Sequence, residues 1–365
     1  MSKPIRVLHC PTNVGSHPVA LCAAERLLGL ESESMAYSCS ALTSPPDICL
    51  GVEGKNPLGE LKRQFFFWKS LSRYDVYHFN FGLSFFQYPG ILSLFNNWDL
   101  PLLKALGKTI IVTYQGCDAR DREACARELE TTPCAEEQCG LPYCNEHRTR
   151  RKRRSIARFN QFADHIFSVT PDVLPFLPDR TDYLPFASVD PALVTPHPPG
   201  NKERLCVVHA PSDTCIKGSS YVNSAIETIM TERDDVDYIR VENMPRKDAL
   251  REYARADVVV DQLLVGSYGT LAVEAMALGK PVICYIRESD MQNLPTMMWE
   301  ELPIVSATPE TIQSVLSDLL NDRSRLKTLG EHGRKYVERW HNPTRVAEQT
   351  KKVYHRYVFG SGKGE

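Results

Sequence analysis

The stretch Gly266–Val282, GSYGTLAVEAMALGKPV, decides the fold of this chain. It follows the apolar run Val258–Val260, and the pattern predicts a strand, a glycine turn, a helix, a glycine stop and another strand. Glycines let the turn approach a ligand closely, and the first free N–H groups of the helix point at that ligand, so this is a place to hold phosphate. Glu274, one turn further in, would accept hydrogen bonds from sugar hydroxyls. The pattern therefore indicates a nucleotide site, although an ordinary strand–helix unit looks the same.

Short apolar runs alternate with amphipathic stretches along the whole chain, which predicts an α/β fold of parallel sheets covered by helices. In the first half we expect strands at 5–10, 34–39, 75–79, 109–113 and 166–170, and helices near 17–28, 60–72, 98–106 and 147–163. In the second half we expect strands at 205–210, 236–241, 257–261, 281–285 and 303–305, and helices near 217–231, 246–255, 268–278 and 309–320. Two further helical stretches fill 322–358, with a break at Asn342-Pro343.

A proline-rich segment divides these two series. We predict an N-terminal domain at 1–185, a linker at 186–200 and a C-terminal domain at 201–341. Each domain would be doubly wound, and ligands bind such sheets at the carboxyl ends of the strands.

Composition narrows the class of protein. A chain of 365 residues with 42% hydrophobic residues is long enough for two domains, and a net charge of −2 argues against a nucleic-acid partner. The N-terminus has no signal-peptide pattern, and no apolar run reaches the roughly 18–20 residues of a membrane span. We therefore expect a cytoplasmic protein whose twelve cysteines are mostly reduced.

A lysine marks a second element of the predicted nucleotide site. The apolar strand Leu205–His209 leads into a loop and then Lys217-Gly218 at the predicted start of a helix. A lysine just past the carboxyl end of a strand can meet a diphosphate together with the helix dipole. The glycine turn at 266–269 would open onto the same edge of the sheet.

These two segments resemble the nucleotide-sugar half of the GT-B glycosyltransferases, closest to family 4. His209–Ser212 with Lys217-Gly218 is similar to the family's strand–loop–lysine element, and 266–282 is similar to its Glu-x7-Glu element. The resemblance is looser in the first half, where the segments that fit an acceptor domain are Asn13-Val14-Gly15, Asp75–His78 and Gln115–Asp118.

The resemblance implies two Rossmann-like domains facing a cleft, with a C-terminal helix at 342–365 returning to the first domain. It also implies transfer of a sugar from a nucleotide-diphosphate sugar to an acceptor hydroxyl, with retention of configuration and without a catalytic metal. Family frequencies favour UDP in the donor.

Site residues follow from the resemblance by position. Lys217 would bind the donor diphosphate and stabilise it as it leaves. Asp118 would orient or deprotonate the acceptor hydroxyl or contact the donor sugar, unless it simply caps a turn or a helix. The remaining donor-binding positions are Gly15 and Ser212 in loops, Glu242 and Met244 beside the base, Ser267, Tyr268, Gly269 and Thr270 around phosphate, and Glu274 at the ribose.

Two positions depart from the family pattern. Gly266 stands where the family usually has a glutamate that addresses the donor sugar, and Ser212 stands where it often has a basic residue. These departures keep two alternatives open: a nucleotide-sugar-binding protein without turnover, and a GT-B sugar epimerase.

Four cysteines gather in the predicted insertion 117–147 of the first domain, in the order Cys125-x8-Cys134-x4-Cys139-x4-Cys144-x2-His147. This density in a chain without a secretion pattern predicts a structural zinc site, held by the four cysteines or by three of them with His147. An iron–sulfur cluster, disulfides and free thiols are the alternatives, and Cys117 is close enough to serve as a ligand.

A run of seven basic residues occupies 148–158. It predicts a solvated helix face, or else contact with a phosphorylated acceptor or an anionic membrane surface. The aromatic run Phe65–Trp68 predicts a helix that packs on the core, with membrane contact as the alternative.

Overall fold

The computed structural model describes residues 3–52, 57–88, 95–135, 139, 144–200 and 202–360. The chain divides into two compact units. Unit 1 comprises Met1–Arg120, Arg150–Ser188 and Pro343–Glu365, and unit 2 comprises Asp121–Thr149 and Val189–Asn342.

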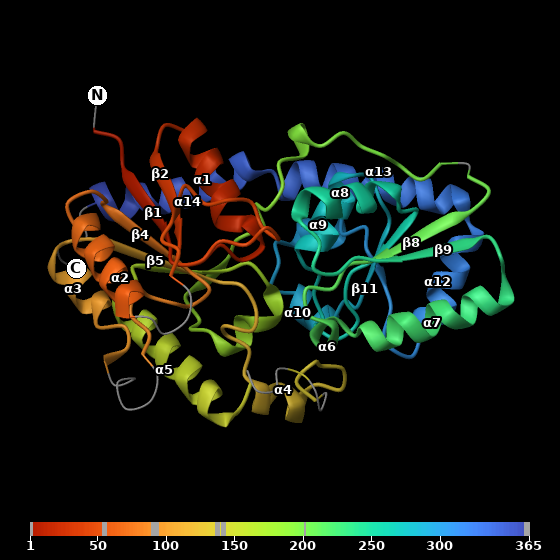
Figure 1. Ribbon diagram of the computed structural model, residues 1–365, viewed down its shortest axis with the longest axis horizontal. Coiled ribbons are helices and arrows are strands. Elements are labelled where there is room, and N and C mark those ends of the chain that lie inside the picture. Colours follow the sequence, from red (N-terminus) through yellow and green to blue (C-terminus); the bar gives the residue numbers. More distant parts are fainter. Residues whose placement is uncertain are drawn as a thin grey trace. The chain divides into compact units, whose positions relative to one another are not determined.

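Unit 1 is built on a parallel seven-stranded sheet in the order β3-β2-β1-β4-β5-β6-β7. Figure 1 labels β1, β2, β4 and β5 of this sheet. The strands are β1 Arg6–Cys10, β2 Glu31–Ala36, β3 Ile48–Cys49, β4 Val76–Asn80, β5 Thr109–Tyr114, β6 His165–Ser168 and β7 Thr181–Tyr183. The helices are α1 His17–Leu27, α2 Pro57–Ser70, α3 Asp99–Ala105, α5 Glu146–Phe162, whose first turn belongs to unit 2, and α14 Pro343–Phe359.

The core of unit 1 explains why these segments form sheet and helix. Strands β4 and β5 are buried along their whole length, as expected for central strands of a parallel sheet covered on both faces. Phe67 of α2, Leu103 of α3 and Phe159 of α5 bury their side chains in one cluster with the strands. Helix α14 packs on α1, so the end of the chain is part of the unit that contains its beginning.

Unit 2 is built on a parallel five-stranded sheet in the order β12-β11-β10-β8-β9. The strands are β8 Leu205–His209, β9 Val236–Arg240, β10 Val258–Val260, β11 Val282–Cys284 and β12 Val305–Ser306. The helices are α4 Arg122–Glu128, α6 Thr214–Lys217, α7 Ser219–Glu232, α8 Arg246–Arg255, α9 Thr270–Ala277, α10 Glu288–Met291, α11 Thr296–Glu300, α12 Ile312–Asn321 and α13 Arg323–Trp340.

Most expected elements lie within a few residues of the observed ones, and the second strand is the main exception. It runs over Glu31–Ala36 instead of 34–39. Its first half alternates Glu and Ser, which gives no apolar signal. Ser32 and Ser34 are nevertheless buried, because their hydroxyls donate to Glu25 Oε2 at 2.6 Å and to Asp47 Oδ2 at 2.7 Å.

The cysteine-containing segment belongs to a different unit from the one expected. The sequence assigned 117–147 to the first domain, whereas Asp121–Thr149 clusters with unit 2. Arg287 Nη2 of unit 2 donates to Thr131 O at 2.9 Å, which attaches the segment to this unit.

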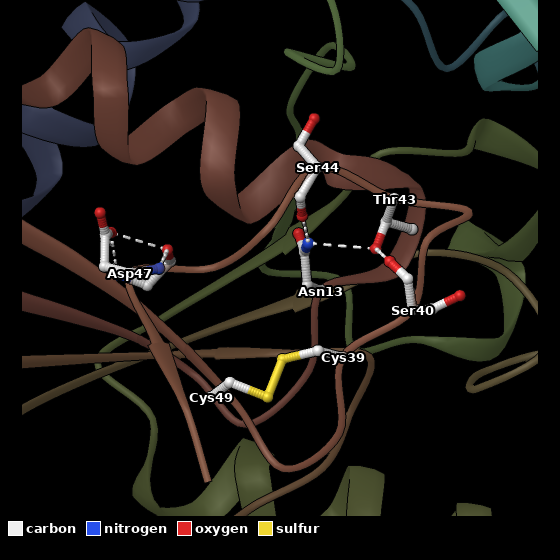
Figure 2. The surroundings of a disulfide bond; sticks show 8 residues. Asn13, Cys39, Ser40, Thr43, Ser44, Asp47 and Cys49 are labelled. Carbon is white, nitrogen blue, oxygen red and sulfur yellow. Dashed lines mark hydrogen bonds between the residues drawn. A yellow bond between two sulfur atoms is a disulfide. The ribbon is translucent and has the colours of Figure 1, made fainter. Parts of the chain in front are cut away.

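A disulfide joins Cys39 to Cys49 in unit 1 (Figure 2), so the expectation of reduced cysteines is wrong for this pair. The loop that it closes lies against the segment after β1. Asn13 Nδ2 donates to Ser44 O at 2.6 Å and to Thr43 Oγ1 at 3.4 Å, and Figure 2 shows both contacts.

Among the described residues, none of the helices has the length and apolarity needed to cross a bilayer.

Candidate functional site

Lys217 ends a one-turn helix that follows β8. The Asp213 side chain begins this helix by accepting from Cys215 N at 3.0 Å and Ile216 N at 2.9 Å, and Gly218 ends it at a φ of 73°. The sequence placed Lys217 at the start of a longer helix. That helix, α7, begins only at Ser219, because the left-handed glycine separates the two.

The Lys217 ammonium is fixed at the carboxyl end of β10. Its Nζ donates to Asp261 Oδ1 at 3.1 Å and also to the Gln262 side-chain oxygen. Asp261 is fully buried, and the Lys217 side chain is 13% exposed. A buried carboxylate needs a partner, so this ion pair holds the ammonium in place while leaving one side of it open to solvent.

The same two residues hold the glycine turn. Asp261 Oδ2 accepts from Gly269 N at 2.6 Å, and the Gln262 amide donates to Ser267 O. A Cβ on Gly269 would lie 3.0 Å from Lys217 Nζ. Lys217 and the turn, which are distant in sequence, therefore come together on one edge of the unit 2 sheet.

Helix α9 begins at this turn. The Asp261 carboxylate satisfies Gly269 N, and the next amides, those of Thr270 and Leu271, have no acceptor inside the helix because they lie in its first turn. Their positive end adds to the Lys217 charge. An anion at this edge would meet an ammonium group and helix amides together.

Glu274 lies one turn into α9 and is 8% exposed. Arg246, in the first turn of α8, donates to Glu274 Oε1 from Nη2 at 2.6 Å and from Nε at 3.1 Å. Burial raises the pKa of Glu274, and the Arg246 charge opposes that rise. Arg246 was not among the residues predicted for the site, although its position just after the Glu242–Met244 loop was an available signal.

The other positions predicted to bind a donor lie in loops. Ser212 is exposed after β8, and Tyr268 is buried. Glu242 and Met244 follow β9, where Glu242 pairs with Arg240, and the intervening Asn243 has a φ of 51°.

An arginine that was not predicted from the sequence, Arg287, lies against Gly266. A Cβ on Gly266 would lie 2.8 Å from Arg287 Cζ and 3.1 Å from Arg287 Cβ. Arg287 Nη1 pairs with Asp290 Oδ2 at 2.7 Å, and Nη2 donates to Thr131 O. The guanidinium therefore fills the space that a larger side chain at position 266 would need.

Asp118 of unit 1 follows β5 and is nearly buried. Gln115 N donates to both of its carboxylate oxygens, at 3.0 and 3.1 Å, so the side chain closes the turn. Burial raises the pKa of Asp118 to about 6, although the backbone hydrogen bonds oppose the rise. The turn cap weighed from sequence is thus present, and the raised pKa is compatible with proton transfer near neutral pH.

The loop after β1 contains the unit 1 glycine predicted to approach a donor. Gly15 has a φ of 60° and Ser16 a φ of 59°, so two successive residues adopt the left-handed conformation before α1. The Ser16 hydroxyl accepts from Ser44 N at 2.9 Å, which ties this loop to the disulfide loop.

A fully buried polar network joins β1, α1, β4 and α14. Glu25 accepts four hydrogen bonds: from His9 Nε2 at 2.9 Å, Ser32 Oγ at 2.6 Å, Thr350 Oγ1 at 2.8 Å and Tyr354 OH at 2.9 Å. Because Tyr354 donates to Glu25, it accepts from His78 Nδ1 at 2.6 Å, and His78 Nε2 then accepts from Thr113 Oγ1 at 2.6 Å. Burial lowers the pKa of His78 well below its usual value, in keeping with this neutral ring.

The structure gives the predicted zinc site no support. Among the described residues, the group of three metal-ligand side chains that lies within 4.8 Å is His9, Cys22 and Glu25, away from the four cysteines. Cys125, Cys134 and Cys139 are buried and Cys144 is half-buried. Within this group, each Glu25 carboxylate oxygen already accepts two hydrogen bonds.

No family model and no curated protein matches this chain. Many solved structures are similar to it, including the following three. Sucrose-phosphate synthase from Thermosynechococcus elongatus is 16% identical with a TM-score of 0.65, covering 98% of this chain and 100% of its own. HepE from Anabaena in complex with UDP-glucose is 11% identical with a TM-score of 0.60, covering 96% and 99%. A putative UDP-N-acetylglucosamine 2-epimerase from Listeria monocytogenes is 14% identical with a TM-score of 0.54, covering 100% of this chain and 99% of its own.

Sequence identities this low show a similarity of fold alone. The chain has the GT-B fold, with two Rossmann-like units of parallel sheet and helix, and the expected fold class is confirmed.

Proposed function

We propose that this protein is a glycosyltransferase that moves a sugar from a nucleotide-diphosphate sugar to an acceptor hydroxyl. One observation carries the proposal: Asp261 and Gln262 hold both Lys217 and the 266–269 turn, so a cation and helix amides meet at the carboxyl end of β10. Nucleotide ligands of doubly wound sheets bind at this edge.

In this proposal Lys217 and the first amides of α9 bind the diphosphate. They stabilise the negative charge that grows on it as the bond to the sugar breaks, and they supply this without a metal ion. Glu274 accepts from the ribose hydroxyls, with Arg246 holding its carboxylate in position. The base lies beside Glu242 and Met244, and Ser212 and Gly15 are further proposed contacts of the donor. The similarity to a HepE structure that holds UDP-glucose supports a UDP-sugar donor.

Asp118 is proposed to act on the acceptor. Its carboxyl, with a pKa near 6, is ionised at neutral pH and would orient the acceptor hydroxyl or accept its proton. The reaction proposed is retaining, as the family resemblance implies.

The second candidate is a sugar epimerase with the same fold. The likeness to the Listeria structure favours it, and so does Gly266, which leaves no carboxylate at that position for the donor sugar. A protein that binds the nucleotide sugar without turnover is the third reading.

The test is incubation with a panel of UDP-, GDP- and ADP-sugars, with detection of released nucleotide diphosphate and of any new sugar. A transferase releases the diphosphate and forms a glycoside when acceptor is present. An epimerase yields an altered sugar without any acceptor, and binding without release would support the non-catalytic reading.

Donor affinity tests the site itself. Lys217→Ala and Glu274→Ala should each weaken UDP-sugar binding by about tenfold or more in calorimetric titration, because each removes a charged partner of the ligand. Lys327→Ala, an exposed lysine of α13 in the same unit, is the control and should bind as the unaltered protein does. Unchanged titrations for both site variants would refute the placement.

A further inference from the structure

Helix α2 carries large apolar side chains on its solvent side. Leu58, Leu61, Phe65 and Trp68 are 68%, 65%, 71% and 53% exposed. They are spaced by three, four and three residues, so they share one face of the helix. This set, here called the α2 face, is an apolar stripe in water.

The α2 face is additional to the packing that holds the helix in place. Phe67 is completely buried, and Phe66 packs against the same core from the opposite side of α2. The aromatic run 65–68 was expected from sequence to pack on the core. Its two central residues do so, whereas Phe65 is mostly exposed and Trp68 is about half exposed, with its ring also against the rings of Phe67 and Trp98.

Two lysines flank the α2 face. Lys62 and Lys69 lie between the stripe and the buried side of α2, and both are exposed. With Phe65, Phe66 and Arg73 they line a groove of about 380 Å³ between α2 and the edge strand β3. The other wall of this groove is apolar and consists of Ile48 and Leu50.

We propose that the α2 face docks on the surface of an anionic lipid bilayer. An interfacial helix places leucine and aromatic side chains among the acyl chains and keeps lysines at the headgroup level, and α2 has this arrangement. The lysines attract negatively charged headgroups, while the groove between them offers an apolar wall to one lipid chain. The chain as a whole carries a net charge of −2, so the attraction is local to this surface.

A second copy of the chain fits this surface less well. A symmetric contact through α2 would bring Lys62 and Lys69 close to the same lysines of the other copy, and like charges at an interface are unfavourable. An anionic surface instead complements these lysines.

The experiment is co-sedimentation of the full chain with vesicles of phosphatidylcholine alone or with one-third phosphatidylglycerol. We expect binding to the anionic vesicles that weakens as salt is added. The double variant Phe65→Ser/Trp68→Ser should lower the partition coefficient by about tenfold or more. Lys62→Glu/Lys69→Glu should lower it similarly on anionic vesicles, because both attractive charges are reversed.

The matched control is Leu193→Ser, which removes an 84% exposed leucine from unit 2 and should leave vesicle binding unchanged. Circular dichroism checks that each variant is folded. We expect all of them to fold, because the substituted positions on α2 are exposed. Nucleotide-sugar titration should be unaffected by any of these variants, so this proposal and the proposed function can fail separately.

Three outcomes would overturn the proposal. The first is absence of binding to anionic vesicles, and the second is equal binding by the Phe65→Ser/Trp68→Ser variant. The third is a dimer in sedimentation velocity that this variant dissociates, since the occupant of the α2 face would then be a second copy.

Discussion

At the scale of single residues, Gly266 shows how a departure from a family pattern is accommodated. Its φ is 83°, and the guanidinium of Arg287 lies where a Cβ would be. Both the backbone and the neighbour exclude a side chain here. The missing glutamate is therefore matched by an arginine from the segment after β11.

Gly29 is a control that separates backbone strain from the contact with Arg287. It has a φ of 85°, and no atom lies within 4 Å of the position that a Cβ would take. Gly29→Ala should lower the free energy of unfolding by about 1 kcal/mol through backbone strain alone. Gly266→Ala should cost about 1–3 kcal/mol more, because Arg287 must leave Asp290 and Thr131 O. Urea denaturation measures both. In Arg287→Ala the excess should disappear, and an equal cost at both glycines would contradict this account.

Asp118 gives a prediction about the pH dependence of catalysis. With a pKa raised to about 6 by burial, the ionised form increases as the pH rises through that value. If Asp118 acts as the base, kcat/KM should rise with pH and level off above about 6. Asp118→Asn should lower kcat/KM by about 10²-fold or more and abolish this limb of the profile. If Asp118→Asn kept the rise of kcat/KM with pH, Asp118 would be a turn cap and not the base.

At the scale of elements, the buried network shows how α14 is attached to unit 1. Thr350 and Tyr354 lie one turn apart on α14, and both donate to the same oxygen of Glu25 on α1. Sequence separation between the partners exceeds three hundred residues. These hydrogen bonds attach the C-terminal helix to the unit that contains the N-terminal strands.

Tyr354→Phe should lower the free energy of unfolding by about 1–2 kcal/mol, because it removes a donor to a buried carboxylate and an acceptor for His78. In this variant, hydrogen exchange of the α14 amides should be accelerated more than that of the central strands. Gln349→Ala, on the exposed side of the helix, should change neither measurement. Comparable losses in both variants would mean that helix propensity, not the network, is being measured.

At the scale of the whole molecule, the His9–Glu25 pair makes stability depend on pH. Burial alone would lower the pKa of His9, but Cys22 and Glu25 raise it to about 10. Burial likewise opposes ionisation of Glu25, and His9 and the donated hydrogen bonds bring its pKa below the usual value.

The directions of these two pKa shifts define a pH range in which both groups stabilise the folded protein. The raised His9 pKa contributes stability that is complete below about pH 6.5 and is lost as the pH rises through about 10. The lowered Glu25 pKa contributes stability that is complete above about pH 4.5 and is lost as the pH falls through its folded value. Both contributions are complete between about pH 4.5 and 6.5. The contribution of the pair is the difference between the unaltered protein and His9→Gln in chemical denaturation across pH. It should be largest in this window, and a difference independent of pH would contradict the assignment.

The sequence by itself determined the alternation of strand and helix, because this alternation depends on local periodicity. The division near 186–200 and the roles of the lysine and the glycine turn stay predictions, which rest on residues with special backbone freedom. It missed β2's polar half, where burial depends on distant partners. Only the tertiary structure decided that Asp261 and Gln262 bind Lys217 to the turn, that Arg287 fills the space beside Gly266, and that Glu25 receives α14. Each of these is a contact between segments far apart in the chain, and such contacts exist only once packing has brought buried polar groups to their partners.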